Sequence, residues 1–197
     1  MSAYSKQDSR QVVGRFTQSN AFWQSFIETV PRSPRAFLGM YLKEAARLMT
    51  NGTLQLSDER LIQYAAREDV SPIDRRKILS ALLPCSTRLH DAELLLRLFG
   101  STSTAERAAV LLSADTTACL FLLFQEMQRA EGDDTLHERV CRELIRRGAP
   151  RHFKLAALMC SYFGLQSVRA TFALRLAPYQ LSRFDGSYHN FQKLIET

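Results

Sequence analysis

The stretch LHERVCRELIRRG, residues 136–148, brings together residue types that can bind a metal ion. His137 and Cys141 are four residues apart, a spacing that places both side chains on one face of a helix, and Glu138 lies beside them. Zinc needs three protein ligands in a catalytic site and four in a structural site, but the other histidines are scattered along the chain. We therefore expect no metal site here. Cys141 should pack inward, and His137 should lie at the polar edge of the helix.

No other catalytic signature stands out in the sequence. It contains no nucleophile elbow, no glycine-rich phosphate loop and no zinc-deaminase pattern. Many carboxylates are spaced to pair with arginine along a helix, as Glu143 is with Arg147 and Glu93 with Arg97. A hydrolase or lyase site assembled in space between helices stays open as an alternative. We expect a non-enzymatic protein with no catalytic residue, no metal and no cofactor.

The charge of the chain changes sign along its length. Residues 1–57 carry a net charge of +4, residues 58–139 carry −4, and residues 140–197 carry +6. Basic surfaces attract the phosphate backbone of nucleic acids, because bound cations release counterions. The C-terminal segment is therefore the place to look for a macromolecule-binding surface.

Aromatic residues are interleaved with cations in this C-terminal segment, a combination that single-strand-binding proteins use for stacking and charge. A second interpretation needs no ligand, because cations in the last turn of a helix also stabilise the helix dipole. The candidate basic patch consists of Arg142, Arg146, Arg147, Arg151, His152, Lys154, Arg169 and Arg175.

The N-terminal stretch NAFWQSFIETV carries a wide apolar stripe that includes Phe22, Trp23 and Phe26. Such a stripe can cover the core of the chain's first helices. It can also lie partly exposed and dock a partner helix or a second copy of the chain. The sequence leaves both interpretations open, so a protein partner or a homodimer is possible at this helix.

Helices must position these residues, because apolar side chains recur at intervals of three and four residues, and no segment alternates convincingly at two. Ser71 before Pro72, and Ser103 before Glu106, predict helix starts. Gly52, Gly100, Gly148 and Gly164 predict helix ends with left-handed backbone. The expected helices cover residues 8–16, 19–30, 33–51, 57–68, 71–83, 88–99, 103–113, 115–130, 134–147, 151–163, 165–177 and 187–196.

Short sequence features recur at intervals of 47 or 48 residues. The triplets that begin at Leu42, Leu89 and Leu136 each join leucine to a basic residue or histidine and then to an acid. This period and its three helices resemble those of HEAT and armadillo proteins. The resemblance implies an all-α, right-handed stacked array of helical hairpins or three-helix units. We expect one domain, residues 1–197, with repeats at 8–52, 53–100 and 101–148 and a helical cap at 149–197. A helical bundle without repeats stays open.

Composition limits where the protein acts. Its 46% apolar and 23% charged residues are ordinary for a globular protein. The first ten residues lack the apolar segment of a secretory signal, and the apolar run over 118–124 is too short to span a bilayer. The four cysteines form no C-x-x-C pair, which favours reduced thiols and a cytoplasmic location.

From these features we expect an adaptor or scaffold that binds another macromolecule, most simply a protein, through a helical surface. A nucleic-acid-binding protein that uses the basic patch is the alternative. We expect no association with membranes.

Overall fold

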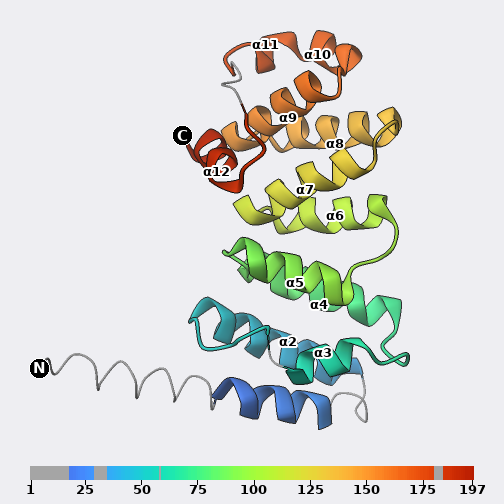
Figure 1. Ribbon diagram of the computed structural model, residues 1–197, viewed down its shortest axis with the longest axis vertical. Helices are drawn as coiled ribbons and strands as arrows, with labels where there is room; N and C mark the ends of the chain where they lie inside the picture. The colour runs from blue at the N-terminus through green and yellow to red at the C-terminus, as the bar shows by residue number, and fades with distance from the viewer. Residues whose placement is uncertain (1–17, 29–34, 58, 180–183) are drawn as a thin grey trace, which may run out of the picture. The chain divides into compact units, whose positions relative to one another are not determined.

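The computed structural model describes residues 18–28, 35–57, 59–179 and 184–197. All regular structure in these ranges is helical, and they contain no strand, so the predicted all-α class is confirmed (Figure 1). The chain divides into two compact units, unit 1 (Met1–Ser101) and unit 2 (Thr102–Thr197). The helix expected at 8–16 falls outside the described residues. No helix in the described ranges is long and apolar enough to cross a membrane.

Unit 1 consists of a helix over residues 18–28 followed by further helices that pack around a common apolar core. The largest fully buried side chains of this core are Trp23, Phe26, Leu61, Ile78, Leu82, Leu83, Leu95 and Phe99. The helices are α2 (Arg35–Thr50), α3 (Glu59–Ala65), α4 (Pro72–Leu82), the 3-10 helix η2 (Leu83–Cys85) and α5 (Leu89–Phe99). Packing of α4 against α2 and α5 holds the unit together.

Of the three helix ends predicted from Ser71, Gly52 and Gly100 in unit 1, two are confirmed and one is wrong. The Ser71 side chain accepts a hydrogen bond from the Asp74 amide and caps α4 as predicted. Gly52 has the predicted left-handed backbone, with φ of 66°. The prediction for Gly100 is wrong, because its φ of −66° and ψ of 146° are extended. Its amide still bonds to the Leu96 carbonyl, so α5 ends without a left-handed turn.

Arg75 closes the ends of two helices in unit 1, a role that the sequence did not indicate. Its guanidinium donates hydrogen bonds to the backbone carbonyls of Ala65 and Arg67, at the end of α3, and of Val70. A further bond, 3.0 Å long, reaches the Leu98 carbonyl in α5. The Ala65 and Leu98 carbonyls lie in the last turns of α3 and α5, where carbonyls lack partners within their own helix, so this side chain replaces missing bonds at both ends.

Unit 2 is built from two close helix pairs and a C-terminal segment that folds back on them. Its helices are α6 (Thr104–Ala114), α7 (Thr117–Arg129), α8 (Asp134–Arg147), α9 (Pro150–Tyr162), α10 (Gln166–Thr171), α11 (Ala173–Leu176) and α12 (Tyr188–Glu196). The most extensive contacts join α6 to α7 and α8 to α9, and α12 packs on both α7 and α9. The single helix expected over 165–177 is two helices, because the backbone leaves helical geometry at Phe172.

Aromatic rings fill the centre of unit 2. Phe124 of α7 is 1% exposed, and its ring centroid lies 5.3 Å from that of Tyr162 and 5.4 Å from that of Phe184. Phe163 and Phe191 complete the surrounding shell at 6.0 and 6.5 Å. Aromatic contacts of this kind stabilise a core beyond simple burial, and here they connect α7, α9 and α12.

Candidate functional site

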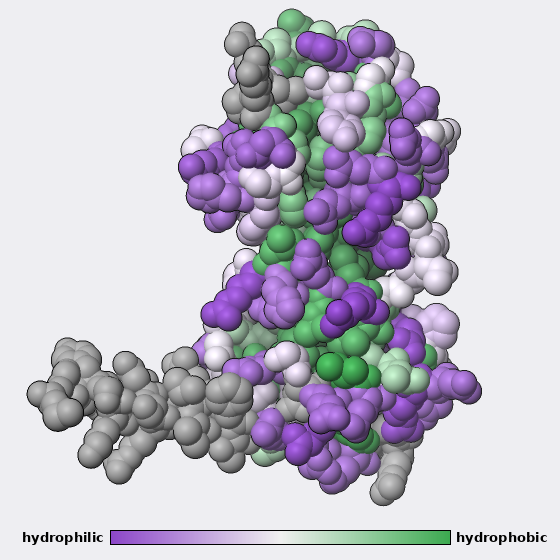
Figure 2. Space-filling view, viewed as in Figure 1, coloured by the Kyte–Doolittle hydropathy of each residue, from purple (hydrophilic) through white to green (hydrophobic). Residues whose placement is uncertain are grey.

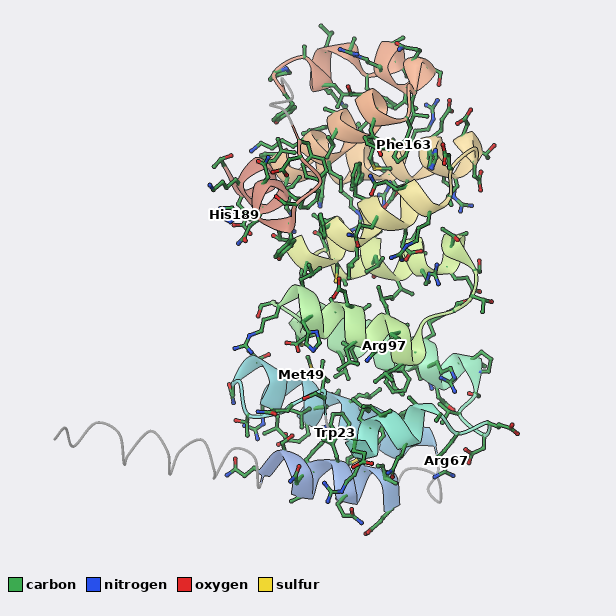
Figure 3. All side chains as sticks on the ribbon, in the orientation of Figure 1. Trp23, Met49, Arg67, Arg97, Phe163 and His189 are labelled. Atoms are coloured by element: carbon green, nitrogen blue, oxygen red, sulfur yellow. The ribbon has the colours of Figure 1, made fainter. Side chains whose placement is uncertain are left out.

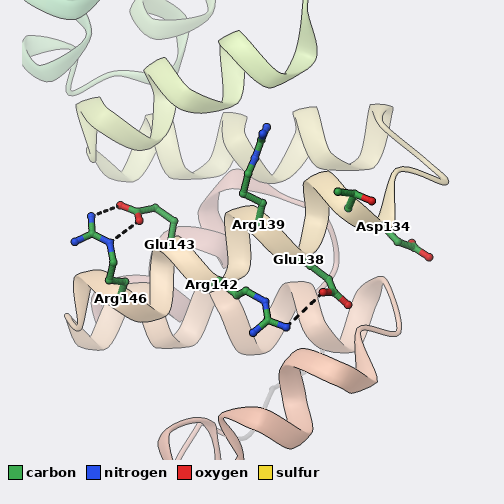
Figure 4. A pocket seen from close by; sticks show the side chains of 7 residues that line it. Asp134, Glu138, Arg139, Arg142, Glu143 and Arg146 are labelled. Carbon is green, nitrogen blue, oxygen red and sulfur yellow. Dashed lines mark hydrogen bonds and ion pairs between the residues drawn. The ribbon is translucent and has the colours of Figure 1, made fainter.

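The outer face of α8 carries both acidic and basic side chains (Figure 4). The face borders an open depression of about 580 Å³. Side chains three and four residues apart share one side of a helix, so this set forms a continuous stripe. The residues that line the depression are Asp134, Thr135, Glu138, Arg139, Arg142, Glu143 and Arg146.

Ion pairs organise most of this stripe. Both guanidinium bonds from Arg146 to Glu143 are 2.7 Å long, and the Arg147 Nε lies 3.4 Å from the same carboxylate. These contacts, the Arg146 bond first, hold the pKa of Glu143 below its usual value. Arg139 is exposed and makes no hydrogen bond or ion pair with any residue that the structure describes.

Glu138 is held by two neighbouring side chains. The Ser167 hydroxyl donates a hydrogen bond to one of its oxygens, and Arg142 lies 3.5 Å from the other. The bond from Ser167 is the main reason that the pKa of Glu138 is lowered, and Arg142 adds to it. The guanidinium of Arg142 also lies 5.9 Å from the centroid of the Phe172 ring.

Three residues of the predicted basic patch are directed into unit 2. Arg147 donates a 2.7 Å hydrogen bond to the Leu112 carbonyl at the end of α6. Arg151 and His152 both contact Asp115, at 2.5 and 2.6 Å respectively. His152 is only 4% exposed. Asp115 is the partner that sequence analysis missed, and its left-handed backbone, with φ of 57°, directs the chain from α6 into α7.

The remaining residues of the basic patch do not join these three into one cationic surface. Arg169 and Arg175 are exposed on α10 and α11, and Lys154 is half-buried on α9. Five of the eight residues pair with carboxylates that belong to the same surface or lie beneath it: Arg142, Arg146, Arg147, Arg151 and His152. The charge of the four arginines is therefore partly balanced locally.

The N-terminal aromatic stripe lies mainly inside unit 1. The side chains of Trp23 and Phe26 are each 1% exposed, and the Trp23 indole donates a 2.8 Å hydrogen bond to the Gln55 carbonyl (Figure 3). The Phe26 ring packs edge-to-face on Tyr64 at 4.9 Å. Phe22 is half-buried. Of these three side chains, only Phe22 is accessible to a docking partner. Trp23 and Phe26 instead cover the core of the first helices, which was the first of the two interpretations of this stripe.

The prediction that His137 lies at a polar edge is wrong. Its side chain is 1% exposed, its Nε2 lies 2.9 Å from the Met127 carbonyl, and its ring stacks on Phe163 with centroids 4.1 Å apart. The imidazole thus bonds to a carbonyl near the end of α7 and also packs in apolar surroundings. Cys141 is fully buried, as predicted. The described residues contain no group of three or more His, Cys, Asp or Glu side chains placed to hold a metal.

The chain matches no family model, no curated protein and no solved structure. Its class is defined by its own residues as an all-helical protein with both acidic and basic side chains on one exposed helix face. Figure 2 shows hydrophilic side chains across most of the visible surface, with smaller apolar areas between them. The stripe on α8 is distinguished from the rest of this surface by the ion pairs between its acidic and basic side chains.

Replacing Arg146 with glutamine is expected to raise the pKa of Glu143 toward its ordinary value, because the Arg146 bond is the main cause that lowers it. A carboxyl pKa that folding lowers contributes stability above the unfolded pKa, about 4.3 for glutamate, and that contribution is lost as pH falls through the folded value. Carbon-detected NMR titration of Glu143 measures the shift. Arg139→Gln is the matched control and should leave this pKa unchanged. An unchanged titration in Arg146→Gln would show that the pair does not form in solution.

Proposed function

We propose that the protein is a non-enzymatic adaptor or scaffold that binds a protein partner, and that the outer face of α8 is its principal contact surface. The observation that carries this proposal is that one exposed helix face carries both signs of charge, with Asp134 and Glu138 toward the start of α8 and Arg142 and Arg146 toward its end. A mixed stripe can be complementary to another mixed protein surface, and it fixes the register of the contact. Arg139 is available for such a contact without first breaking an ion pair within the described residues.

A nucleic-acid partner is the second candidate, and the pairing of charges weighs against it. Binding to phosphates gains from the release of counterions by cations. Arg142, Arg146 and Arg151 already have carboxylate partners in the same unit, so they would offer less net charge to a phosphate backbone. Exposed Arg169 and Arg175 are the features that favour this alternative.

We propose further that the helices form a HEAT- or armadillo-like right-handed stack of hairpins, as the sequence period suggested. Two contacts support stacking within unit 2, because His137 of α8 bonds to Met127 of α7 and Arg147 of α8 bonds to Leu112 of α6. The close pairing of α8 with α9 crosses the repeat boundary expected at residue 148. The repeats at 8–52, 53–100 and 101–148, the cap at 149–197 and the single domain stay predictions.

A cytoplasmic location is part of the same proposal. None of the four cysteines is in a disulfide, and three of them are buried. Thiols of this kind fit a reducing compartment. The half-buried side chain of Phe22 leaves the N-terminal helix as a second place where a partner or another copy of the chain can bind. This surface is smaller than the outer face of α8.

Reversing charge on α8 tests the proposed function. We expect the double variant Arg139→Glu/Arg142→Glu to weaken partner binding by about tenfold or more, because a contact at the centre of an interface commonly contributes over 1 kcal/mol. Partners are first captured from host extract and identified by mass spectrometry, and binding of the purified partner is then measured by calorimetry. The control Lys77→Glu/Arg97→Glu makes the same charge change at exposed positions in unit 1.

Three results separate the candidates. Loss of binding in the α8 variant with binding retained in the control supports the proposal. The proposal is contradicted if the α8 variant and the control variant bind the partner with equal affinity. Labelled RNA and DNA are tested in parallel by fluorescence anisotropy at low and physiological salt. Oligonucleotide binding that survives physiological salt and disappears on Arg169→Glu/Arg175→Glu would favour the second candidate instead.

A further inference from the structure

Two cysteine side chains face each other across the α8–α9 hairpin. Cys141 lies on α8 and Cys160 on α9, and their thiols are in hydrogen-bonding contact. The neighbouring turn of the hairpin has the same register, because His137 stacks on Phe163. His137 is four residues before Cys141 and Phe163 three residues after Cys160, as expected for two antiparallel helices. The register of the hairpin therefore agrees with the contact between the two thiols.

The two thiols differ in their access to solvent. Cys141 is fully buried, whereas Cys160 is 2% exposed and lines a pocket of about 560 Å³ between α9 and the short helices α10 and α11. The cation of Arg169 and the ring of Tyr179 also line this pocket. A small molecule in the pocket would lie against Cys160 but not against Cys141, which does not line it.

The surroundings of the two thiols also separate their acidity. The bond with Cys141 lowers the pKa of Cys160, and the nearby charge of Arg169 acts in the same direction. The pKa of Cys141 is raised by the same bond and by burial. The thiolate, which is the nucleophilic form of cysteine, therefore forms first at Cys160, on the side that faces the pocket.

We propose that Cys160 and Cys141 are a reversible thiol–disulfide modification site, oxidised by a hydroperoxide that enters the pocket beside Arg169. The Cys160 thiolate attacks one peroxide oxygen, the O–O bond breaks, and the leaving hydroxide or alkoxide takes up a proton. Sulfur is oxidised by two electrons to sulfenic acid, and the peroxide is reduced to water or alcohol. The Cys141 sulfur then attacks the Cys160 sulfur, the S–S bond forms, and the sulfenic oxygen leaves as water with the Cys141 proton.

This inference does not rest on the proposed adaptor function. The other cysteines differ from this pair in their surroundings. Cys119 is fully buried, and burial raises its pKa. Cys85 is half-buried beside a pocket in unit 1 that no second cysteine lines. They serve as internal controls in the test.

The test is peptide mapping of the full-length protein after treatment with hydrogen peroxide. Remaining thiols are blocked with N-ethylmaleimide, and the protein is digested with trypsin without reduction. We expect one linked product that joins residues 140–142 to residues 155–169 and disappears with dithiothreitol. Cys85→Ser and Cys119→Ser should leave this product unchanged. In Cys141→Ser, Cys160 should accumulate as sulfenic acid that dimedone captures, and Arg169→Gln should slow its capture several-fold.

Two outcomes would overturn the proposal. One is the absence of the linked peptide from oxidised wild-type protein at peroxide levels that modify Cys160. The other is unchanged oxidation of Cys141 in Cys160→Ser. The wild-type map needs no variant, so it decides the question even where a buried cysteine variant fails to fold. Circular dichroism and the melting temperature confirm that Arg169→Gln is folded before its rate is compared.

Discussion

Replacement of Phe124 with alanine is expected to lower the free energy of unfolding of unit 2 by about 4 kcal/mol, the largest effect of any single change considered. Deletion of a buried phenylalanine ring costs roughly 3–5 kcal/mol through lost transfer energy and the cavity left behind. Phe124 falls in the upper part of this range because it is 1% exposed and contacts four other aromatic rings. Each such ring pair adds roughly 0.5–1.5 kcal/mol.

Urea unfolding followed by circular dichroism measures this loss, and hydrogen exchange locates it. Phe191 of α12 contacts Phe124 directly, so the amides of α12 should lose protection more than those of α6. Phe124→Leu is the matched control and should cost less than half as much, since leucine keeps most of the apolar volume. A loss below about 1 kcal/mol in the alanine variant would show that the aromatic core is not packed as described.

Replacement of Glu126 with alanine is expected to cost about 3 kcal/mol in the free energy of unfolding. The side chain of Glu126 is 4% exposed and accepts bonds from Arg107 at 2.6 Å and Arg129 at 2.5 Å. Removal of one member of a buried ion pair costs roughly 3–5 kcal/mol, because the other charge stays in a poor dielectric environment. The lower end applies here, because the Arg107 side chain is 26% exposed and water screens part of its charge.

Two control variants separate the charge from the packing of Glu126. Glu126→Gln keeps the shape and one acceptor oxygen, so it should cost less than alanine. Arg129→Ala should have an effect of at most about 1 kcal/mol, because the Arg129 side chain is 64% exposed. Chemical denaturation compares all three variants at the same pH and salt. If the glutamine and alanine variants are equally stable, the paired carboxylate contributes little.

Helix positions were predictable from the sequence because local signals set them. Ser103 caps α6 and Gly148 ends α8 in the left-handed conformation, as predicted. Those signals are backbone requirements that a few neighbouring residues satisfy. Gly100 is one exception, because glycine is permitted but not required to adopt the left-handed conformation. The break at Phe172 is the other, because no proline or glycine marks the end of the helix there.

The partners of the candidate site residues were less predictable, because they are distant in sequence. Asp115 and Arg151 are 36 residues apart, and no periodicity relates them. His137 lies beside the apolar stripe of α8, and helical spacing does not decide whether such a residue faces solvent or a neighbouring helix. The Met127 carbonyl and the Phe163 ring decide it. Similarly, four cysteines without a spacing motif gave no sign that Cys141 and Cys160 would meet.

The 47-residue period in the sequence differs from the spacing between successive helix pairs in the structure. The N-cap residues Ser71, Ser103 and Asp133 begin α4, α6 and α8 and are 32 and then 30 residues apart. A pair of helices with short connections needs about this length, whereas the sequence period contains three helices. Leucine is a common residue, so short matches that include it give information about the spacing of helices. They do not identify which helices pack against each other.

The return of α12 onto α7 sets the order in which unit 2 can assemble on the ribosome. Glu196 accepts a hydrogen bond from Thr117, 79 residues earlier, and Phe191 packs on Phe121. The hairpins α6–α7 and α8–α9 consist of local contacts, which form quickly as each pair emerges. The apolar face of α7 around Phe121 must then stay uncovered until α12 has been synthesised. During that interval the nascent chain depends on rapid synthesis or on chaperones to avoid association through this face.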